Sequence, residues 1–403
     1  MCRFAGFRLS LVTFLLFFGF GATAPVMSLY LQDRLHFTGT QTGLVMSASA
    51  LSAPLSPVIC SFLADRVISA ERLFAFLLLV GGGLMGALYR TDSFAAFLAL
   101  YLLHSVAVGA TASLLNAIIF HKLEDRRQYG RIRVWGTLGW IAVAWVFGWL
   151  WLRGAGGQPL PERLPDALLL CALSMVGLGL YSFTLPPSVE LNRGAKPELL
   201  PRVAFAIVRQ PAAVWLALVT LAANVTDRIY TYSAAIFLVQ SGVSEPNVLP
   251  MLSVGQIPEI FAMLFLGRLT ARLGLVRVML LGALCNVARY GFFIFGGSRL
   301  ALIAGIAMHG LSFTFFFSTV FILLDSMAQR ESRAGVHQLF TLVYGGIGGL
   351  LGSWIAGGLM DACRLPYGTI RFDILWSVPF AIAAAVAGAL AWGLRRAYPS
   401  AKS

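Results

Sequence analysis

The stretch LSVGQIPEIFAML, residues 252–264, places a carboxylate, Glu259, inside an otherwise apolar run. If this run crosses a membrane, an ionised carboxylate there costs about 2.5–3.5 kcal/mol on insertion scales, so we expect it to face a protein cavity and serve a function. Gln256 lies on the same helical face, and Pro258 removes a backbone donor and should bend the helix. Glu259 is therefore a candidate proton carrier and Gln256 a candidate binding residue. The alternative is that Glu259 pairs with Arg289 and locks two helices together.

A second acidic position lies in the stretch ANVTDRIYTYS, where Asp227 and Arg228 are adjacent and Thr231 follows one turn later. Neighbouring residues on a helix point about 100° apart, so these two charges cannot both face the same neighbour. We expect one of them to line a cavity, and Asp227 is a second candidate proton carrier. Asp325 is a weaker candidate because it lies at the end of its apolar run, where water can solvate it.

Three further side chains share one face of a predicted helix. Arg133, Thr137 and Trp140 follow an i, i+4, i+7 pattern, which aims a cation, a hydroxyl and an aromatic plane in one direction. That set suits a planar, oxygen-rich ligand. The alternatives are that Arg133 belongs to the preceding basic loop and that Trp140 packs against lipid or another helix. His309 and Phe313 are also one turn apart, although a lone histidine in a helix is often a packing residue.

The composition defines the solvent around these residues. Of 403 residues, 58% are hydrophobic and only 12% charged, and the mean hydropathy is +0.80, whereas a soluble domain has roughly 25% charged residues. Apolar runs of about 18 or more residues, long enough to cross a hydrocarbon core about 30 Å thick, recur along the chain. We predict an all-α, polytopic membrane protein with twelve transmembrane helices: 9–31, 41–64, 72–90, 93–119, 132–152, 165–185, 211–239, 247–267, 275–296, 299–324, 336–360 and 373–394.

The net charge of +13 could indicate a nucleic-acid partner, but the placement of the basic residues argues against one. Apart from Arg228 and Arg289, about 21 Lys and Arg lie at the termini and in the even-numbered connections, against about 7 in the odd-numbered ones. The positive-inside rule then places both termini in the cytoplasm. Pro25 directly after ATA disfavours a signal peptide, because the apolar run continues past it.

Metal and enzyme chemistry find no support in the sequence. The five cysteines are odd in number, scattered and without metal-ligand spacing. The chain also lacks HExxH, GxSxG and paired-cysteine patterns. We therefore expect no cofactor, no metal and no catalytic residues.

The chain contains an internal repeat. SFLADRVISAERL matches GRLTARLGLVRVM at an offset of about 206 residues, and WGTLGWIAVAWVFGWL matches VYGGIGGLLGSWIAGGL at nearly the same offset. Two six-helix halves, 1–186 and 211–403, are the economical interpretation. The polar segment 187–210, rich in prolines and charges, is then a cytoplasmic linker.

This organisation resembles the major facilitator superfamily, and the loop ADR followed by basic residues is similar to that superfamily's signature between helices 2 and 3. Ser61 replaces the usual leading glycine, whereas the C-terminal counterpart begins with Gly267. Four stretches more closely resemble the nucleoside:proton symporter family, in the same order and spacing: RIRVWGTLGWIAVAWV, SVGQIPEIFAMLFLGRLTARLG, NVARYGFFIFG and GLSFTFFFSTVFILLD followed by RAGVHQLF.

The resemblance implies roles for several residues. In that family the positions matching Arg133, Thr137 and Trp140 contribute to nucleoside binding. Glycines at three- and four-residue spacing in the stretch YGGIGGLLGSWIAGG allow close helix packing, which is compatible with mobility during alternating access.

The chain also departs from the family pattern. Amide side chains stand at the family positions aligned with Arg228 and Thr231. His309 and Phe313 match a tyrosine and a phenylalanine, and Thr314 stands where relatives often carry an acid. These differences affect the choice of substrate more than the fold.

Together these patterns predict a proton-coupled secondary transporter that imports nucleosides or similar polar ring compounds. Substrate would bind between the halves, with Glu259 or Asp227 holding the proton. We expect a monomer in a bacterial inner membrane whose partners are substrate, protons and the lipid bilayer. The predicted substrate-binding residues are Arg133, Thr137, Trp140, Arg228, Thr231, Gln256, His309 and Phe313.

Other functions remain open. Aromatic acids or oligosaccharides would suit the same fold. Arg228 together with Arg133 could favour an anion. A sensor without turnover would carry the same helices. An intramembrane enzyme is disfavoured for want of a nucleophile and base.

Overall fold

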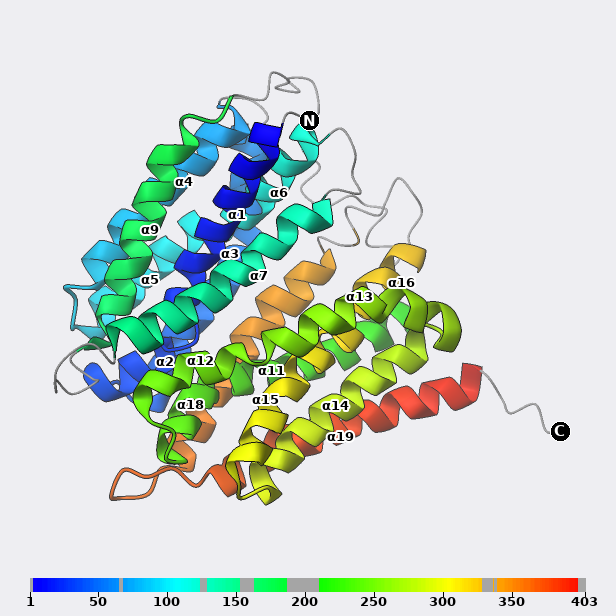
Figure 1. Cartoon of the computed structure of the whole chain (residues 1–403). Coiled ribbons are helices and arrows are strands. Elements are labelled where there is room, and N and C mark those ends of the chain that lie inside the picture. The colour runs from blue at the N-terminus through cyan, green and yellow to red at the C-terminus, as the bar shows by residue number, and fades with distance from the viewer. Residues whose placement is uncertain are drawn as a thin grey trace. The chain divides into compact units, whose positions relative to one another are not determined.

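The computed structural model describes residues 3–64, 68–123, 129–152, 163–186, 210–327, 336 and 339–397. Helices form almost all of this part of the chain (Figure 1), and its β structure is one isolated bridge between Arg364 and Ile370. The predicted all-α class is therefore confirmed.

Contacts divide the chain into two compact units. Unit 1 comprises Met1–Leu199 and Ala234–Pro250, and unit 2 comprises Leu200–Ser233 and Met251–Ser403. The predicted boundaries at 186 and 211 stay a prediction, because residues 187–209 of the linker lie outside the described residues.

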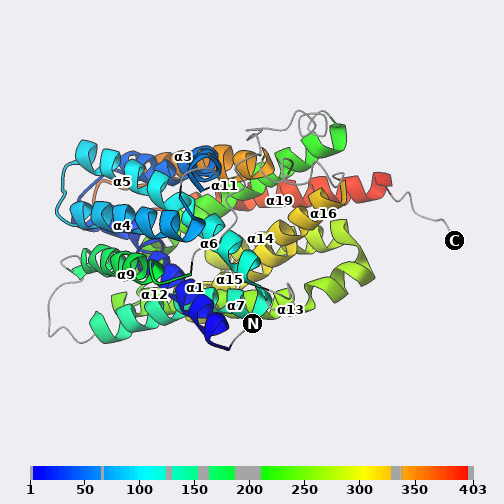
Figure 2. The ribbon, with the colours of Figure 1, turned by 90° about the horizontal axis from the view of Figure 1, so that it is seen from above.

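Unit 1 is a bundle of long helices around a small-residue interface. α1 lies along α7, and α4 packs between α9 and α5, as Figures 1 and 2 both show. The α1–α7 approach depends on glycine: Gly139 contacts the backbone of Phe14, and a Cβ at Gly21 would come 3.1 Å from the Trp140 ring. The main elements are α1 (Arg3–Thr23), α2 (Met27–Leu29), α3 (Gly39–Ala64), α4 (Ala70–Leu88), α5 (Phe94–Gly109), α6 (Thr111–Lys122), α7 (Tyr129–Trp145) and α9 (Asp166–Ser182), with π-helical turns at Tyr30–Arg34 and Val146–Trp151.

Unit 2 contains α11 up to Ser233 and the helices that follow Met251. They are α11 (Pro211–Gln240), the end of α12 (Val248–Ser253), α13 (Gln256–Leu273), α14 (Leu275–Phe295), α15 (Arg299–Ser312), α16 (Thr319–Met327), α18 (Gly349–Ala362) and α19 (Phe372–Ala397), with π-helical turns η5 (Phe313–Ser318) and η6 (Leu342–Gly348). Gly274, at φ 82°, forms the tight turn between α13 and α14 because glycine adopts positive φ without steric cost. Ser298 caps α15 by accepting a hydrogen bond from the Ala301 N–H at 3.2 Å.

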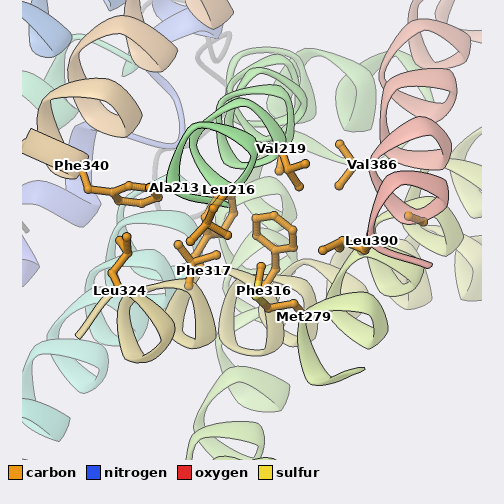
Figure 3. Packing of buried hydrophobic residues seen from close by; sticks show 14 of the residues in the cluster. Ala213, Leu216, Val219, Met279, Phe316, Phe317, Leu324, Phe340, Val386 and Leu390 are labelled. Carbon is orange, nitrogen blue, oxygen red and sulfur yellow. The ribbon is translucent and has the colours of Figure 1, made fainter. Parts of the chain in front are cut away.

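The apolar core of unit 2 lies where α11, α14, α19 and the π-helical turn η5 meet. Leu216 of α11, Met279 of α14, Phe316 of η5 and Leu390 of α19 are each at most 2% exposed, and Figure 3 shows their side chains gathered together. α11 also approaches α18 closely, because Gly352 leaves room for the Arg228 side chain. The glycines of this stretch therefore serve helix packing, as the sequence predicts.

Ten helices in the described residues are long and apolar enough to cross a bilayer, and α9 is a shorter apolar helix. Helical segments overlap all twelve predicted spans. α3 covers the predicted span 41–64, but its side chains beyond residue 52 lie outside the described residues. The polytopic membrane architecture is confirmed, and the count of twelve stays a prediction.

The predicted bend beside Glu259 is confirmed as a break in the helix. α12 ends at Ser253 and α13 begins at Gln256, with Gly255 between them. Pro258 is the third residue of α13, where a backbone N–H would have no acceptor within the helix. Glu259 lies in the first turn of the new helix, whose N-terminal partial positive charge favours a carboxylate.

Candidate functional site

The most concentrated polar chemistry of unit 2 is a buried charge cluster on three helices. Asp227 of α11, Arg289 of α14 and His309 of α15 meet there. The Asp227 Oδ1 atom lies 3.5 Å from Arg289 Nη1 and 3.4 Å from His309 Nδ1. Arg289 Nη1 is only 2.7 Å from His309 Nδ1. The side chains of Arg289 and Asp227 are 1% and 11% exposed, so their charges compensate each other away from water.

Arg289 is held in place by α11 and by its own helix. Its Nη2 donates to the Asn286 side-chain oxygen and, at 2.9 Å, to the Tyr290 hydroxyl. Both of these residues then bond to Thr226 of α11: Asn286 donates to its hydroxyl at 2.9 Å, and Tyr290 donates to its carbonyl at 2.6 Å. Because each partner is itself anchored, the guanidinium has a fixed orientation.

Aromatic rings enclose the same cluster. The Arg289 guanidinium lies 4.4 Å from the centroid of the Tyr230 ring, a cation–π distance. The Tyr230 ring in turn packs on His309 at 4.8 Å and is parallel to Phe293 at 6.1 Å. Phe313 follows one turn after His309, with 6.5 Å between ring centroids. The predicted binding residue His309 thus lies beside the predicted proton carrier Asp227, with Phe313 next to His309.

Arg228 packs against a different helix from the cluster that its neighbour Asp227 joins. Its Cβ and Cγ atoms pack over Gly352 of α18. Its buried Nε has no hydrogen-bond partner among the described residues. Thr231 donates its hydroxyl to the Asp227 carbonyl at 2.9 Å, so its oxygen keeps only acceptor capacity.

Glu259 and Gln256 lie on α13, which packs closely against α15. Gly310 makes this approach possible, because a Cβ there would come 2.9 Å from the Glu259 backbone nitrogen. The hydroxyl of Thr314 is 3.5 Å from the Glu259 carbonyl, too long for a strong hydrogen bond. The carboxylate paired with Arg289 is that of Asp227.

The predicted face of α7 in unit 1 is made of partly buried side chains. The Arg133 guanidinium lies 4.4 Å from the Phe17 ring centroid of α1. The Trp140 ring packs over Gly21 of the same helix. Thr137 lies between them in sequence and is half-buried. Arg133 and Trp140 therefore have packing partners in α1, while none of the three is fully enclosed.

A cavity of about 240 Å³ in unit 1, lined by both apolar and polar side chains, was not foreseen from the sequence. Its lining includes Thr23, Ser49, Ser52, Tyr101, His104 and Ser105. The Nδ1 of His104 bonds the Gly81 carbonyl at 2.9 Å, and its ring stacks on Tyr101. The sequence feature that could have indicated this cavity is the adjacent pair His104 and Ser105 within an apolar run.

Sequence reasoning also missed the network that anchors Arg289. Tyr230, Asn286 and Tyr290 form this network. The signal in the sequence was the set of polar residues in the stretch NVARYGFF, residues 286–293. Asp325 lies in α16, partly exposed, away from these contacts. Among the described residues, no group of three or more His, Cys, Asp or Glu could hold a metal ion.

Comparison with known proteins defines the class. The chain is similar to the crystal structure of the nucleoside transporter NupG, with a TM-score of 0.85, 21% identity and coverage of 96% of this chain and 98% of that one. This likeness shows that the apolar, membrane-length helices of this chain adopt the fold of that membrane protein.

The family follows from the sequence match. Residues 4–398 match the nucleoside H+ symporter family, and the chain belongs to that family. It is 31% identical to the Escherichia coli (strain K12) protein YegT, over 92% of this chain and 88% of the relative. It is 26% identical to the xanthosine permease of the same organism, over 92% and 91%.

Proposed function

We propose that this protein imports nucleosides, or polar ring compounds of similar size, together with protons. The observation that carries the proposal is the buried cluster of Asp227, Arg289 and His309 in an otherwise apolar helical unit. Ionisable side chains inside membrane-spanning helices are expensive and mark ion and substrate pathways. Membership of the nucleoside H+ symporter family supports the solute class and the coupling ion.

The proposed binding residues fall into one set in each unit. Arg133, Thr137 and Trp140 of α7 offer a cation, a hydroxyl and an aromatic plane, and partial exposure leaves them reachable. The second set is Arg228, Thr231, Gln256, His309 and Phe313 in unit 2. An aromatic plane suits a nucleobase, because every base has a π-face. Hydroxyl and amide groups suit the sugar.

Glu259 and Asp227 are the proposed proton-coupling carboxylates. Glu259 lies at the start of a half-helix, the kind of element that forms substrate and ion sites in secondary transporters. One charge moving across 100 mV is worth about 2.3 kcal/mol. A single proton would therefore support an accumulation of roughly fiftyfold before any pH gradient is counted.

The proposed setting is a bacterial inner membrane, with both termini in the cytoplasm and a monomer as the working unit. The excess of Lys and Arg at the termini and even-numbered connections supports the orientation. Cysteine labelling from one side of intact vesicles would test it at each terminus.

An anionic ring compound is the second candidate substrate. Arg228 carries a buried Nε without a hydrogen-bond partner among the described residues, and a carboxylate would satisfy it. Thr314, where relatives often carry an acid, also makes this part of unit 2 less negative.

Transport by reconstituted protein tests the proposal. Purified full-length protein in liposomes, with an acid exterior imposed, should accumulate labelled uridine and xanthosine above equilibrium. A protonophore should abolish the accumulation, and protein-free liposomes should show none. Nucleoside uptake that ignores the gradient would contradict proton coupling. Uptake of labelled benzoate that unlabelled uridine does not inhibit would favour the anionic substrate.

A further inference from the structure

The Nδ1 atom of His309 has two potential partners that demand opposite protonation states. Arg289 Nη1 lies 2.7 Å away, and Asp227 Oδ1 lies 3.4 Å away. A guanidinium can only donate hydrogen bonds, and a carboxylate can only accept them. One ring nitrogen therefore cannot bond both groups at once.

The shorter contact assigns the protonation state shown by this geometry. Arg289 stays protonated and donates, so His309 Nδ1 must offer a lone pair. A neutral imidazole has one donor and one acceptor nitrogen, which places the remaining ring proton on Nε2. With Arg289 as its partner, His309 is the neutral Nε2–H tautomer, and Asp227 pairs with Arg289 Nη1 at 3.5 Å.

Adding one proton reverses this pattern. A proton from water adds to the Nδ1 lone pair, Nε2 keeps its own proton, and the ring becomes an imidazolium. Nδ1 can then no longer accept from Arg289, and it becomes a donor towards Asp227. A closure of about 0.5 Å would bring the 3.4 Å contact to the length of a charge-assisted hydrogen bond.

His309 is the member of the cluster that can respond. The Arg289 guanidinium is anchored through Asn286 and Tyr290, and its side chain is 1% exposed. Asp227 is 11% exposed, whereas the His309 side chain is 20% exposed. The His309 side chain is therefore the most accessible of the three.

We propose that His309 is a proton-binding residue, and that protonation of its Nδ1 exchanges Arg289 for Asp227 as its hydrogen-bond partner. His309 thereby acts as a positioning residue for Phe313, one turn later on the same helix. The proposal rests on the proposed function for its role in transport, but the partner exchange itself requires no substrate. Among the described residues, the charged and titratable groups near His309 on the elements packed around it are Asp227 and Tyr230 of α11, Arg289 and Tyr290 of α14, and Glu259 of α13.

A direct test follows the histidine nitrogens by NMR. Full-length protein in nanodiscs, labelled with ¹⁵N-histidine, contains five histidines. The His309 signals are identified by their loss in His309→Gln, and His121→Gln, on the exposed last turn of α6, serves as matched control. The wild type should show an unprotonated Nδ1 and a protonated Nε2 at alkaline pH, and both nitrogens protonated at acid pH. A protonated Nδ1 at both pH values, or an unprotonated one at both, would overturn the proposal.

A second variant tests the partner exchange. Asp227→Asn keeps the shape and an acceptor oxygen but removes the negative charge, so the protonated ring loses its charge-assisted partner. Its His309 Nδ1 should stay unprotonated at a pH where the wild-type nitrogen is already protonated. Identical titration in both proteins would exclude Asp227 as the partner. If Asp227→Asn fails to fold, Arg289→Lys serves as the second variant. It keeps the positive charge but not the anchored guanidinium, so at high pH the ¹⁵N signal of His309 Nδ1 should lose the shift caused by its hydrogen bond from Arg289.

Uridine binding then separates this inference from the proposed function. Between about pH 5.5 and about pH 8, wild-type affinity should change several-fold, and His309→Tyr, which carries the residue of relatives, should flatten this profile. An unchanged pH profile in His309→Tyr would contradict the positioning role. If the wild type bound no nucleoside at all, the proposed function would fail, while the NMR titration would still decide whether His309 exchanges its partners.

Discussion

The guanidinium of Arg289 and the carboxylate of Asp227 form an ion pair, 3.5 Å apart, between α14 and α11. Removing one member of a buried pair leaves the other charge uncompensated. Arg289→Met should therefore lower the free energy of unfolding by about 3–5 kcal/mol, and thermal unfolding of the purified protein would measure the loss. The double variant Asp227→Asn with Arg289→Met should regain part of it, because no charge is then stranded.

An exposed ion pair provides the control for that experiment. Arg371 and Asp373 lie 2.9 Å apart, but their side chains are 50% and 59% exposed. Water screens such pairs, so Arg371→Met should leave the unfolding temperature nearly unchanged. If Arg289→Met and Arg371→Met lowered the unfolding temperature equally, the buried Asp227–Arg289 pair would contribute no more to stability than the exposed pair.

Glu259→Gln should uncouple transport while preserving binding. Glutamine mimics the permanently protonated carboxyl group and keeps its shape, so the first turn of α13 should persist. Uphill accumulation of uridine under a pH gradient should vanish, whereas exchange of labelled for unlabelled uridine, which needs no net proton movement, should continue. Undiminished accumulation would move the proposed carrier role to Asp227. Loss of both activities would indicate a binding or structural role. Asp325→Asn is the control variant, which should keep both uphill accumulation and exchange.

Trp140→Ala should weaken nucleoside binding by about 1–3 kcal/mol if its ring stacks on a base. The ring also packs over Gly21, so binding and stability must be measured on the same preparation. Trp135 on the same helix is 43% exposed, and Trp135→Ala provides the matched control. Wild-type affinity with a lower unfolding temperature would assign Trp140 to packing alone.

Arg228→Gln should shift the substrate preference towards neutral nucleosides. Glutamine keeps the Cβ and Cγ atoms that pack over Gly352 and changes only the head group, so α11 and α18 should remain packed. Uptake of uridine relative to benzoate should rise, and Arg228→Lys, which keeps the charge, should leave the ratio closer to wild type. Loss of folded protein in Arg228→Gln would indicate a structural role for the guanidinium.

Much of the helical architecture could be predicted from the sequence, because the bilayer imposes a length and an apolar composition on each crossing. The break before Glu259 was also predictable, since Pro258 cannot continue a helix without disturbing it. Gly255 supplied the point of interruption.

The charge cluster could be predicted only in part. Sequence identified Asp227 and His309 as exceptional residues in apolar runs but could not pair them, because they lie on different helices and their meeting depends on packing. Arg289 was assigned to Glu259 as an alternative, whereas the structure pairs it with Asp227. The cavity beside His104 escaped prediction because the hydroxyls in its lining come from several helices, each with ordinary spacing.

The π-helical turn Phe313–Ser318 sets a register between α15 and α16. A π-helical turn holds one residue more than an α-helical turn, so the residues before and after it do not share a single helical phase. Phe316 and Val320 reach the core of unit 2 with this extra residue in place. If the same residues formed a regular α-helix instead, everything after the turn would be rotated by about 100° relative to His309, and Val320 and Leu324 would turn out of the core. The extra residue thus allows one continuous helix to present two independently phased faces, one to the charge cluster and one to the apolar core.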